Sequence, residues 1–467
     1  MSAEAAIIST LVVYKLVLLG IGYWASKRTK NDADFYLGGR SLGPWVAALS
    51  SAASSSSAWT LLGVSGAAYT MGLGAVWLFP ACLGGFLLNW CVVAKPLKRA
   101  ADASGAVTLT EFLSQGSSPT LARKFVLSAS IIVLLCLLVY VASQFQAAGE
   151  TFATTLDMNF ITAVIVGGVI VLVYTTLGGF WAASVTDMIQ GLVMAAAAIA
   201  VPLVALIKLG GFGAMFSGLE EAGAQYVDWT GGHSGWLLVA FLAGKFGIGL
   251  GYPGQPHVVN RFMAIRSEKE IRRGTIITMT WGVIIYGGML ITGWCGRALV
   301  SSINNDETIL LHLTTDLFSP IPAGIIIAAV LSAIMSTADS QLLVCGSTVA
   351  YDMPRKQGTQ RMVSNRLTMM GLGAAAILAA ILIDDTIFNT VLFAWSGLGA
   401  AFGPLLLVRL SGRSVDQRYA LAALWVGFAT SIVWFYTPAL KGMVYELVPA
   451  FLLALGVCLA GSRKLAA

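Results

Sequence analysis

Residues 46–63 read VAALSSAASSSSAWTLLG and place six serines within eight residues of an otherwise apolar segment. Serine hydroxyls compete for backbone hydrogen bonds and loosen a transmembrane helix, and backbone groups freed at membrane depth are tolerated only against protein or a polar cavity. The stretch therefore predicts a broken helix that lines a site, where carbonyls and hydroxyls can bind a small cation and a half-helix N-terminus can bind a carboxylate. The alternative is close helix packing, because Ala and Ser are also the small residues of transmembrane interfaces. The stretch alone favours neither interpretation.

The composition indicates a membrane protein with many spans. Of the 467 residues, 57% are hydrophobic and 11% are charged, and the mean hydropathy is +0.81, whereas an average soluble domain has about 25% charged residues. The formal net charge of +6 does not indicate a nucleic-acid partner, because the basic residues fall in short clusters between apolar runs, as orientation signals do. The six cysteines stand singly, without the spacing of a metal site or a disulfide framework.

Runs of about 20 apolar residues, the length that a bilayer requires, predict an all-α membrane protein with about 13 transmembrane helices. The predicted spans are 6–25, 43–70, 74–94, 124–152, 159–177, 184–208, 235–258, 275–297, 321–350, 366–384, 387–408, 418–436 and 444–461. If the N-terminus is outside, most of the 28 Lys and Arg lie in cytoplasmic loops, as the positive-inside rule requires. These cytoplasmic clusters include Lys27, Arg28, Lys30 and Arg40, then Arg261, Arg266, Lys269, Arg272 and Arg273, then Arg355, Lys356, Arg361 and Arg366. We therefore expect a multi-pass protein of the plasma (inner) membrane with its N-terminus outside and its C-terminus in the cytoplasm.

A second interruption occurs in the seventh predicted span, five spans after the serine-rich one. Residues 243–259 read AGKFGIGLGYPGQPHVV, a glycine-rich run with Pro253 and Pro256. Two interrupted helices in corresponding positions indicate an inverted repeat with a binding site at the bilayer midplane. We expect one polytopic domain over 1–467, with a first repeat over 43–208 (spans 2–6), a second over 235–408 (spans 7–11), and flanking helices in 1–42 and 409–467.

Polar residues inside predicted spans are costly and therefore usually functional. In the ninth span, the hydroxyls of Ser336, Thr337 and Ser340 stack along one helical face. Facing the serine-rich break, they would complete an all-oxygen cage for a hard cation; the alternative is that they bond back to their own helix. Two acids inside predicted spans, Asp187 and Asp339, are not explained by that alternative.

Three further polar residues lie in predicted spans. Tyr140 and Gln144, one helical turn apart, can offer aromatic and amide contacts to a solute. Lys245 stands about one turn before the second break. Snorkelling toward the outer surface, pairing with an acid and taking the place of a cation are all open interpretations of this lysine.

Several segments carry a resemblance to a known family. They are YLGGRSLGP (36–44), YTTLGGFWAASVTDMIQ (174–190), GLGYPGQPHVVNRFMA (249–264), MSTADSQLLV (335–344) and AWSGLGAAFGP (394–404). Together with the serine-rich break, they resemble the sodium:solute symporter family over nearly all of the chain, and within it they are most similar to bacterial sodium/proline symporters. The resemblance implies a five-plus-five inverted-repeat fold, alternating access and sodium-driven solute uptake across the plasma membrane.

Carried over by position, the resemblance implies two cation sites and a solute pocket. The main sodium site would use the carbonyls of Ala53, Ser56 and Ala333 and the hydroxyls of Ser336 and Thr337. A second cation site, or a cation path, would involve Ser55, Asp187, Asp339 and Ser340. The solute pocket would involve Ser57, Ala58, Tyr140, Gln144, Ile248, Tyr252, Gln255 and Pro256.

At three of these positions the chain departs from the proline symporters. Ser55 replaces an aspartate, Ile248 a tryptophan and Gln144 a glycine. A neutral hydroxyl attracts a cation less strongly than a carboxylate does, so the first change weakens the expectation of tight sodium binding. The other two weaken the expectation that the solute is proline, because aromatic surface is exchanged for an amide.

These inferences predict a secondary active symporter rather than an enzyme. Sodium influx (Na+ as the coupling ion) would drive uptake of a small amino acid or carboxylate, with proline or a related amino acid as the first candidate. Proton coupling is the main rival mechanism, uptake of another small carboxylate the rival substrate, and a solute-sensing membrane module the rival of another class. With three histidines and neither an HExxH motif nor a nucleophile–base pair, the sequence does not indicate an intramembrane enzyme. The expected partners are the solute and membrane lipid, without nucleic acid, and the oligomeric state stays open.

Overall fold

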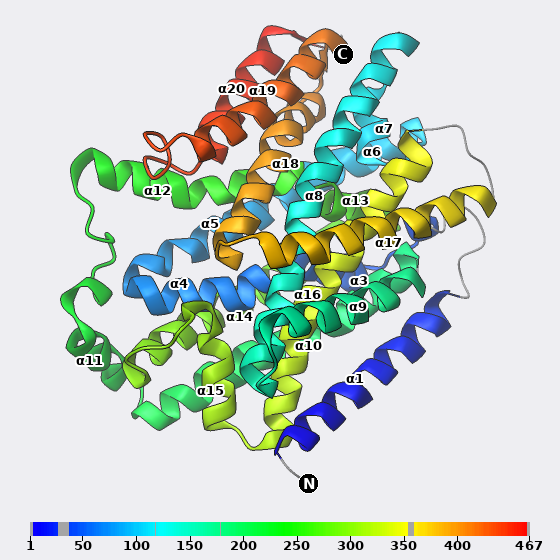
Figure 1. Cartoon of the computed structure of the whole chain (residues 1–467). Helices are drawn as coiled ribbons and strands as arrows, with labels where there is room; N and C mark the ends of the chain where they lie inside the picture. Colours follow the sequence, from blue (N-terminus) through cyan, green and yellow to red (C-terminus); the bar gives the residue numbers. More distant parts are fainter. Residues whose placement is uncertain (1–2, 27–36, 117, 178, 354–358, 465–467) are drawn as a thin grey trace.

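The chain folds into a bundle of helices with one short strand pair (Figure 1). The computed structural model describes residues 3–26, 37–116, 118–177, 179–353 and 359–464. The α-helices are α1 (Ala3–Ser26), α3 (Pro44–Ser55), α4 (Val64–Met71), α5 (Leu78–Leu87), α6 (Ala94–Ser104), α7 (Leu109–Ser114), α8 (Pro119–Leu156), α9 (Phe160–Leu177), α10 (Phe180–Leu209), α11 (Phe212–Ala222), α12 (Gly235–Leu250), α13 (Pro256–Ala264), α14 (Glu268–Leu299), α15 (Ile309–Leu317), α16 (Pro320–Ser347), α17 (Thr359–Leu382), α18 (Ile387–Leu410), α19 (Gln417–Tyr436) and α20 (Leu447–Ala460). The shorter 3-10 or π-helical segments are η1 (Gly38–Arg40), η2 (Trp59–Gly63), η3 (Gly72–Trp77), η4 (Leu88–Val93), η5 (Ala224–Tyr226), η6 (Tyr252–Gly254), η7 (Asp306–Thr308) and η8 (Thr348–Asp352). Outside the described residues lie Tyr36 and Gly178 of the quoted motifs and the basic residues Lys27, Arg28, Lys30, Arg355 and Lys356.

The helices confirm a protein with many membrane spans. Within the described residues, 10 helical stretches are long and apolar enough to cross a bilayer, and α9 and α20 are shorter apolar helices. Each predicted span overlaps helical residues. Residues 59–104 form one continuous helical stretch, which contains the end of the second predicted span and the whole of the third. The number of thirteen crossings and the inverted repeat remain predictions.

Helices α16 and α18 lie at the centre of the bundle and α1 lies at its edge (Figure 1). In the most apolar 18 residues of the helical stretch that contains α16, 83% of the residues are buried, and the share is the same for α18. In the most apolar 18 residues of α1, 22% of the residues are buried. Helix α16 packs against α1, α3, α8, α10 and α17, while α3 packs against α10, α13 and α14. This packing brings the serine-rich end of α3 against both α10 and α16.

Both predicted helix interruptions are present. Helix α3 ends at Ser55, and the N–H of Ser56 bonds back to the Ala53 carbonyl at 3.2 Å before the chain resumes in η2. In the second interruption, the short η6 turn separates α12 from α13. Pro253 and Pro256 have no backbone N–H to donate, which stops a helix, and Pro256 at the first position of α13 suits the start of a new one.

The second interruption packs closely against α18 because glycine stands on both sides. A Cβ atom at Gly254 would lie 2.6 Å from the Gly399 Cα and from the Leu398 carbonyl oxygen. Trp395, one turn earlier in α18, donates its indole N–H to the Ile248 carbonyl at 3.1 Å. The break in α12–α13 is therefore held directly against α18.

One small element was absent from the all-α prediction. Strands β1 (Arg413–Val415) and β2 (Ser462–Lys464) pair antiparallel, with Arg413 opposite Lys464 and Val415 opposite Ser462. Three residues per strand are too few to show an alternating pattern in the sequence. The pair ties the chain after α18 to the end of α20.

A buried acid connects the loop before α15 to the start of α18. Glu307 is 7% exposed, and its carboxylate accepts hydrogen bonds from the backbone N–H groups of Ile387 (2.8 Å) and Phe388 (2.7 Å). These are among the first N–H groups of α18, which have no partner within the helix. Burial raises the pKa of Glu307 to about 7, the two N–H bonds lower it, and the nearby Glu150 and Asp385 raise it further.

The raised pKa makes the stability of wild type fall with increasing pH. Since an unfolded glutamate titrates near pH 4.3, Glu307 binds its proton more tightly in the folded protein, and its contribution to stability is full below about pH 4 and lost as the pH rises through about 7. We expect the thermal unfolding midpoint of wild type in detergent to fall, relative to that of Glu307→Gln, between about pH 5 and pH 8. Asp306→Asn, at the half-buried neighbouring acid, is the control and should follow wild type. A midpoint difference that stays constant with pH would contradict the titration of Glu307.

Candidate functional site

Neutral oxygens from two helices converge where α3 ends. The Ser336 hydroxyl lies 3.3 Å from the Ala53 carbonyl oxygen and 3.2 Å from that of Ala333. The Thr337 hydroxyl lies 3.5 Å from the Ala53 carbonyl oxygen and 3.2 Å from that of Ser54. All of these residues are buried. The structure thus brings together four of the five residues of the expected main sodium site and adds the Ser54 carbonyl.

The chemistry of this oxygen cluster fits a small hard cation. Carbonyl and hydroxyl oxygens are the ligands of hard cations, and unwound backbone carbonyls coordinate sodium in broken-helix transporters. Each hydroxyl carries two lone pairs besides its hydrogen, so rotation about its C–O bond can turn a lone pair toward an ion. The remaining expected ligand, Ser56, adjoins the cluster, and its own hydroxyl lies 3.4 Å from the Tyr286 hydroxyl.

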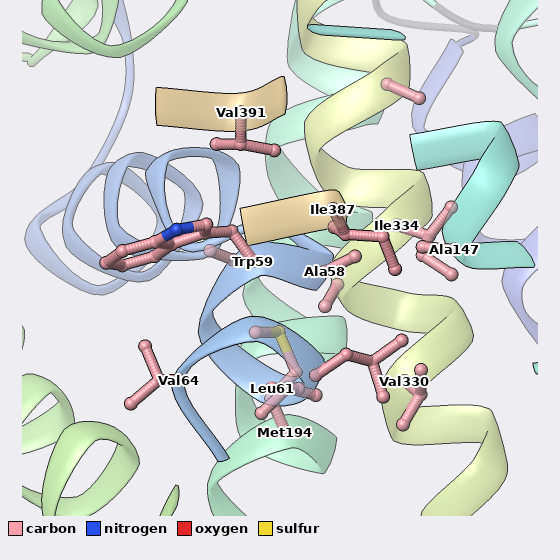
Figure 2. Close-up of a cluster of buried hydrophobic side chains, with 14 of the residues drawn as sticks. Ala58, Trp59, Leu61, Val64, Ala147, Met194, Val330, Ile334, Ile387 and Val391 are labelled. Atoms are coloured by element: carbon pink, nitrogen blue, oxygen red, sulfur yellow. The ribbon is translucent and has the colours of Figure 1, made fainter. Parts of the chain in front are cut away.

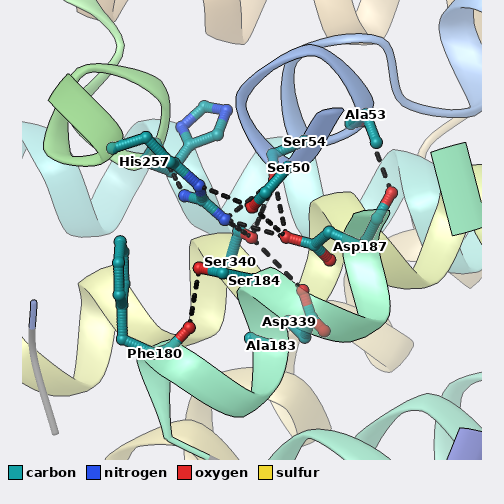
Figure 3. Close-up of polar contacts among 12 residues, drawn as sticks. Ser50, Ala53, Ser54, Phe180, Ala183, Ser184, Asp187, His257, Asp339 and Ser340 are labelled. Carbon is teal, nitrogen blue, oxygen red and sulfur yellow. Dashed lines mark hydrogen bonds and ion pairs between the residues drawn. The ribbon is translucent and has the colours of Figure 1, made fainter. Parts of the chain in front are cut away.

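A second polar cluster extends one turn back along α3, to Ser50, and is centred on an ion pair. The Arg261 guanidinium lies 3.0 Å from Asp187 Oδ2, and both side chains are almost fully buried. It also donates to the hydroxyls of Ser50 (3.0 Å) and Ser54 (2.9 Å), and to Ser340 and the His257 carbonyl. Figure 3 shows the hydroxyls of Ser50 and Ser54 turned toward the Asp187 carboxylate, while the Ser340 hydroxyl lies 3.0 Å from that of Ser54.

This cluster corrects the expected position of one residue and shows where the residues of the expected second cation site lie. Arg261 was assigned to a cytoplasmic loop, but it is 1% exposed and lies inside the bundle, on α13 between α3 and α10. Its guanidinium occupies the region where a second cation was expected around Asp187 and Ser340. Ser55 does not join the cluster, because its hydroxyl bonds to the Ala52 carbonyl of its own helix at 3.0 Å. Asp339 reaches it only through Ser340, whose hydroxyl lies 3.3 Å from Asp339 Oδ1.

The expected solute pocket is an aromatic group around a tryptophan. The Trp395 ring stacks edge-on against Tyr252, with ring centroids 4.7 Å apart, and against Tyr140 at 6.5 Å. Gln255 turns its amide to the backbone, donating to the carbonyls of Trp395 (3.0 Å) and Gly251 (3.2 Å). Pro256 is buried at the start of α13. Tyr140 and Tyr252 thus both lie edge-on to one indole ring, while Gln255 holds the break in place.

Gln144 caps the second half of the first broken helix. Its side-chain oxygen accepts the backbone N–H of Ala58 at 3.0 Å, and its amide donates to the Ser143 hydroxyl at 3.1 Å. The Ser57 hydroxyl beside it accepts the Trp59 N–H (3.1 Å) and lies 3.4 Å from the Tyr140 hydroxyl. Free N–H groups at such a helix start attract carboxylates. Gln144 therefore occupies the position on the broken helix where a solute carboxylate can bind.

Apolar side chains enclose this break. Figure 2 shows Val330 and Ile334 of α16 and Ile387 of α18 gathered near Ala58. The neighbouring Trp59 ring stacks on Phe388, with centroids 5.2 Å apart. The Ala58 amide is therefore shielded from water, which strengthens its hydrogen bonds.

Sequence reasoning missed Arg261, Trp395 and the Ser54 hydroxyl as site residues. Arg261 and Trp395 lie within quoted family motifs. Arg261 follows His257 by one helical turn, and this spacing is typical of a residue on the half-helix after the break rather than in the loop beyond it. Ser54 lies one helical turn after Ser50, so both face α10. The four-residue spacing of Ser50 and Ser54 was the feature of the sequence that indicates this second polar face of the helix.

Comparison with known proteins agrees with the resemblance. The family model for the sodium:solute symporter family matches residues 35–427. Among relatives, the high-affinity proline transporter of Bacillus subtilis (strain 168) is 38% identical over 93% of this chain and 93% of its own length, and the osmoregulated proline transporter of the same organism is 34% identical over 96% and 93%. The sodium/proline symporter of Escherichia coli (strain K12) is 33% identical over 97% and 92%.

A solved structure matches the whole fold. It is the substrate-bound outward-open state of a Na+-coupled sialic acid symporter, which is 19% identical and superposes with a TM-score of 0.82 over 99% of each chain. The identity to these relatives and the family match over most of the chain together show the family of this protein. The protein belongs to the sodium:solute symporter family and is a multi-pass membrane transporter rather than an enzyme.

Proposed function

We propose that this protein couples sodium influx to the uptake of a small zwitterionic or carboxylate solute, with proline or a related amino acid as the first candidate, by alternating access. The relatives named as proline transporters and sodium/proline symporters support this solute class. The observation that carries the proposal is the oxygen cluster formed by Ala53, Ala333, Ser336 and Thr337 at the end of α3. In this proposal the N-terminus lies outside, the C-terminus is cytoplasmic, and residues 43–208 and 235–408 are the inverted repeats.

Coupling follows from the position of this oxygen cluster on the broken helix. The carbonyls of Ala53 and Ser54 belong to α3, and the hydroxyls of Ser336 and Thr337 belong to α16. A sodium ion bound by both helices would hold the end of α3 in one position. Four residues on, the same break presents the Ala58 N–H, so sodium binding and carboxylate binding favour one arrangement of the backbone, which makes them mutually reinforcing.

Gln144 sets the selectivity of this site in our proposal. A solute carboxylate that binds the Ala58 N–H must displace the Gln144 oxygen, or else the amide must bond the solute itself. A site built around a polar side chain rejects solutes that do not satisfy it, since an unpaired buried polar group costs about 1–3 kcal/mol. The glutamine therefore favours a solute with a polar group beside its carboxylate over plain proline.

The double change Gln144→Gly with Ile248→Trp is expected to shift selectivity toward proline. The glycine frees the Ala58 N–H, and the tryptophan adds aromatic surface beside Trp395, whose indole bonds the Ile248 carbonyl. The measurement is the concentration of unlabelled L-proline that halves uptake of the preferred labelled solute, which should fall about tenfold in the double variant. An unchanged concentration would show that these two positions do not set selectivity.

Proton coupling is the second candidate, and one observation favours it. Asp187 Oδ1 and Asp339 Oδ2 are buried and accept no hydrogen bond from the described residues. A carboxylate with an open oxygen inside the membrane is a typical proton carrier in transporters. Sodium remains the first choice because the oxygen cluster at the break contains only neutral ligands, which bind a metal ion and not a proton.

Uptake by the purified protein in lipid vesicles tests the proposal. A panel of labelled amino acids and small carboxylates, L-proline included, is supplied with an inward sodium gradient, with a proton gradient, and with neither. We expect saturable accumulation of one zwitterionic or carboxylate solute only under the sodium gradient. Accumulation that follows the proton gradient in sodium-free buffer would replace sodium by protons, and non-saturating flux would indicate a channel.

A further inference from the structure

A cavity of about 380 Å³ lies beside the second helix break. Helix α12, the start of α18, the end of α19 and the loop before α20 form its walls, and Ile248 and Phe388 are among its lining residues. Two loops contribute residues to the lining of this cavity, 210–234 and 437–446. Both loops lie on the side of the membrane that the positive-inside rule predicts to be outside. Ile248 also touches the central site through the Trp395 indole, so the cavity adjoins the solute pocket on the predicted outer side.

Lys245 projects into this cavity and has no acidic partner among the residues that the structure describes. Its ammonium nitrogen lies 3.8 Å from the Met71 sulfur and over the rings of Phe241 (5.3 Å) and Phe388 (5.9 Å). Among the described residues, no carboxylate lies within 4.0 Å of this nitrogen, and no oxygen atom accepts its hydrogen bonds. A half-buried ammonium with three donors and no oxygen acceptor gains strongly from an anionic ligand.

The other charged and titratable groups of the cavity leave room for such a ligand. Lys441 also lines it, but its nitrogen lies over the Phe435 ring at 4.3 Å and the residue is exposed. His233 stacks against Phe241 with ring centroids 5.1 Å apart. Glu446 is the acid that lines the same cavity, and it offers a counter-charge for an amino group. The volume is in the range of small-molecule sites.

We propose that Lys245 is the carboxylate anchor of an outer docking site, where a zwitterionic solute binds before it passes Ile248 into the central pocket. This inference rests on the proposed uptake function and adds the residue that recognises the acid group. It bears on two of the interpretations left open for Lys245. Within the part of the chain that the structure describes, the side chain pairs with no acid, and it does not lie with the oxygen clusters of α3 and α16.

Initial uptake rates at increasing solute concentration test the proposal. The probe is labelled L-proline or, if the vesicle panel selects another solute, that solute. Lys245→Met keeps the length of the side chain and removes the charge, and we expect it to raise KM at least about tenfold without changing the sodium dependence. Lys245→Arg should stay near wild type. The matched control Lys441→Met, on the same cavity, should leave KM unchanged.

Chemical rescue of one folded protein separates charge from structure. In a Cys91→Ser background, which removes the exposed native cysteine, Lys245→Cys should show the raised KM. Treatment with an aminoethyl methanethiosulfonate restores a primary ammonium and should lower KM again, whereas the uncharged methyl reagent should not. The solute should also slow the modification of this cysteine, and its decarboxylated analogue, pyrrolidine in the case of L-proline, should not.

The outcomes separate the two proposals. A wild type without sodium-driven uptake of any panel member overturns the proposed function. Wild-type uptake combined with an unchanged KM in Lys245→Met overturns the role of Lys245 alone. Equal protection of the cysteine by the carboxylate solute and its decarboxylated analogue overturns that role as well, independently of transport.

Discussion

Asp187→Asn is expected to reduce uptake at least about hundredfold, because it leaves the Arg261 guanidinium buried without its counter-charge, a change that costs about 3–5 kcal/mol. Arg261→Gln should cost a similar amount, since it leaves the Asp187 carboxylate with only hydroxyl partners. The double variant removes both charges of this pair, so neither is left without its partner, and it should recover much of the lost thermal stability. Unfolding midpoints and uptake rates of the four proteins form a double-mutant cycle.

The control for this cycle is Asp384→Asn, which removes an exposed acid and should behave as wild type. A coupling energy of several kcal/mol is the expected result, because a buried pair is worth far more to each partner than an exposed one. Losses in the two single variants that simply add in the double variant would contradict a direct interaction between Asp187 and Arg261.

The second large effect concerns sodium activation. Ser336→Ala and Thr337→Ala are each expected to raise the sodium concentration for half-maximal uptake about fivefold to a hundredfold, because each removes one oxygen of the proposed sodium site, worth about 1–3 kcal/mol. Solute affinity at saturating sodium should change less, since neither hydroxyl contacts the Ala58–Gln144 pair in the structure.

Ser347→Ala is the matched control on the same helix. Ser347 is buried, but its hydroxyl bonds to the Val344 carbonyl of α16 itself, so its loss should leave sodium activation unchanged. If all three variants show wild-type sodium dependence, the cluster at the end of α3 does not bind the coupling ion. If all three lose it equally, the effect comes from the stability of α16 rather than from a ligand.

The helix breaks could be predicted because their causes are local. Six serines at the first break weaken a regular helix locally, although four of them still lie within α3, and two prolines within a glycine-rich run stop the helix at the second. The face of Ser336 and Thr337 followed from helical spacing in the same way. The β1–β2 pair could not be predicted, because strands of three residues show no period.

The partners of the polar residues depend on packing and could not be predicted. Arg261 stands among arginines that the sequence predicts to be cytoplasmic, and only the packing of α13 against α3, which itself packs against α10, buries it beside Asp187. The sequence left open whether Gln144 bonds a solute or fills space. Its bond to the Ala58 N–H, 86 residues away, is a contact between helices that no local pattern encodes.

The central claim is that solute and sodium cross together. The most direct measurement is solute-stimulated ²²Na+ entry into vesicles that contain the purified protein, made in parallel with uptake of the labelled solute. The account predicts that solute accelerates ²²Na+ entry, with the same concentration dependence as sodium-driven solute uptake, and that Ser336→Ala with Thr337→Ala weakens both together. Solute accumulation without accelerated ²²Na+ entry would contradict it.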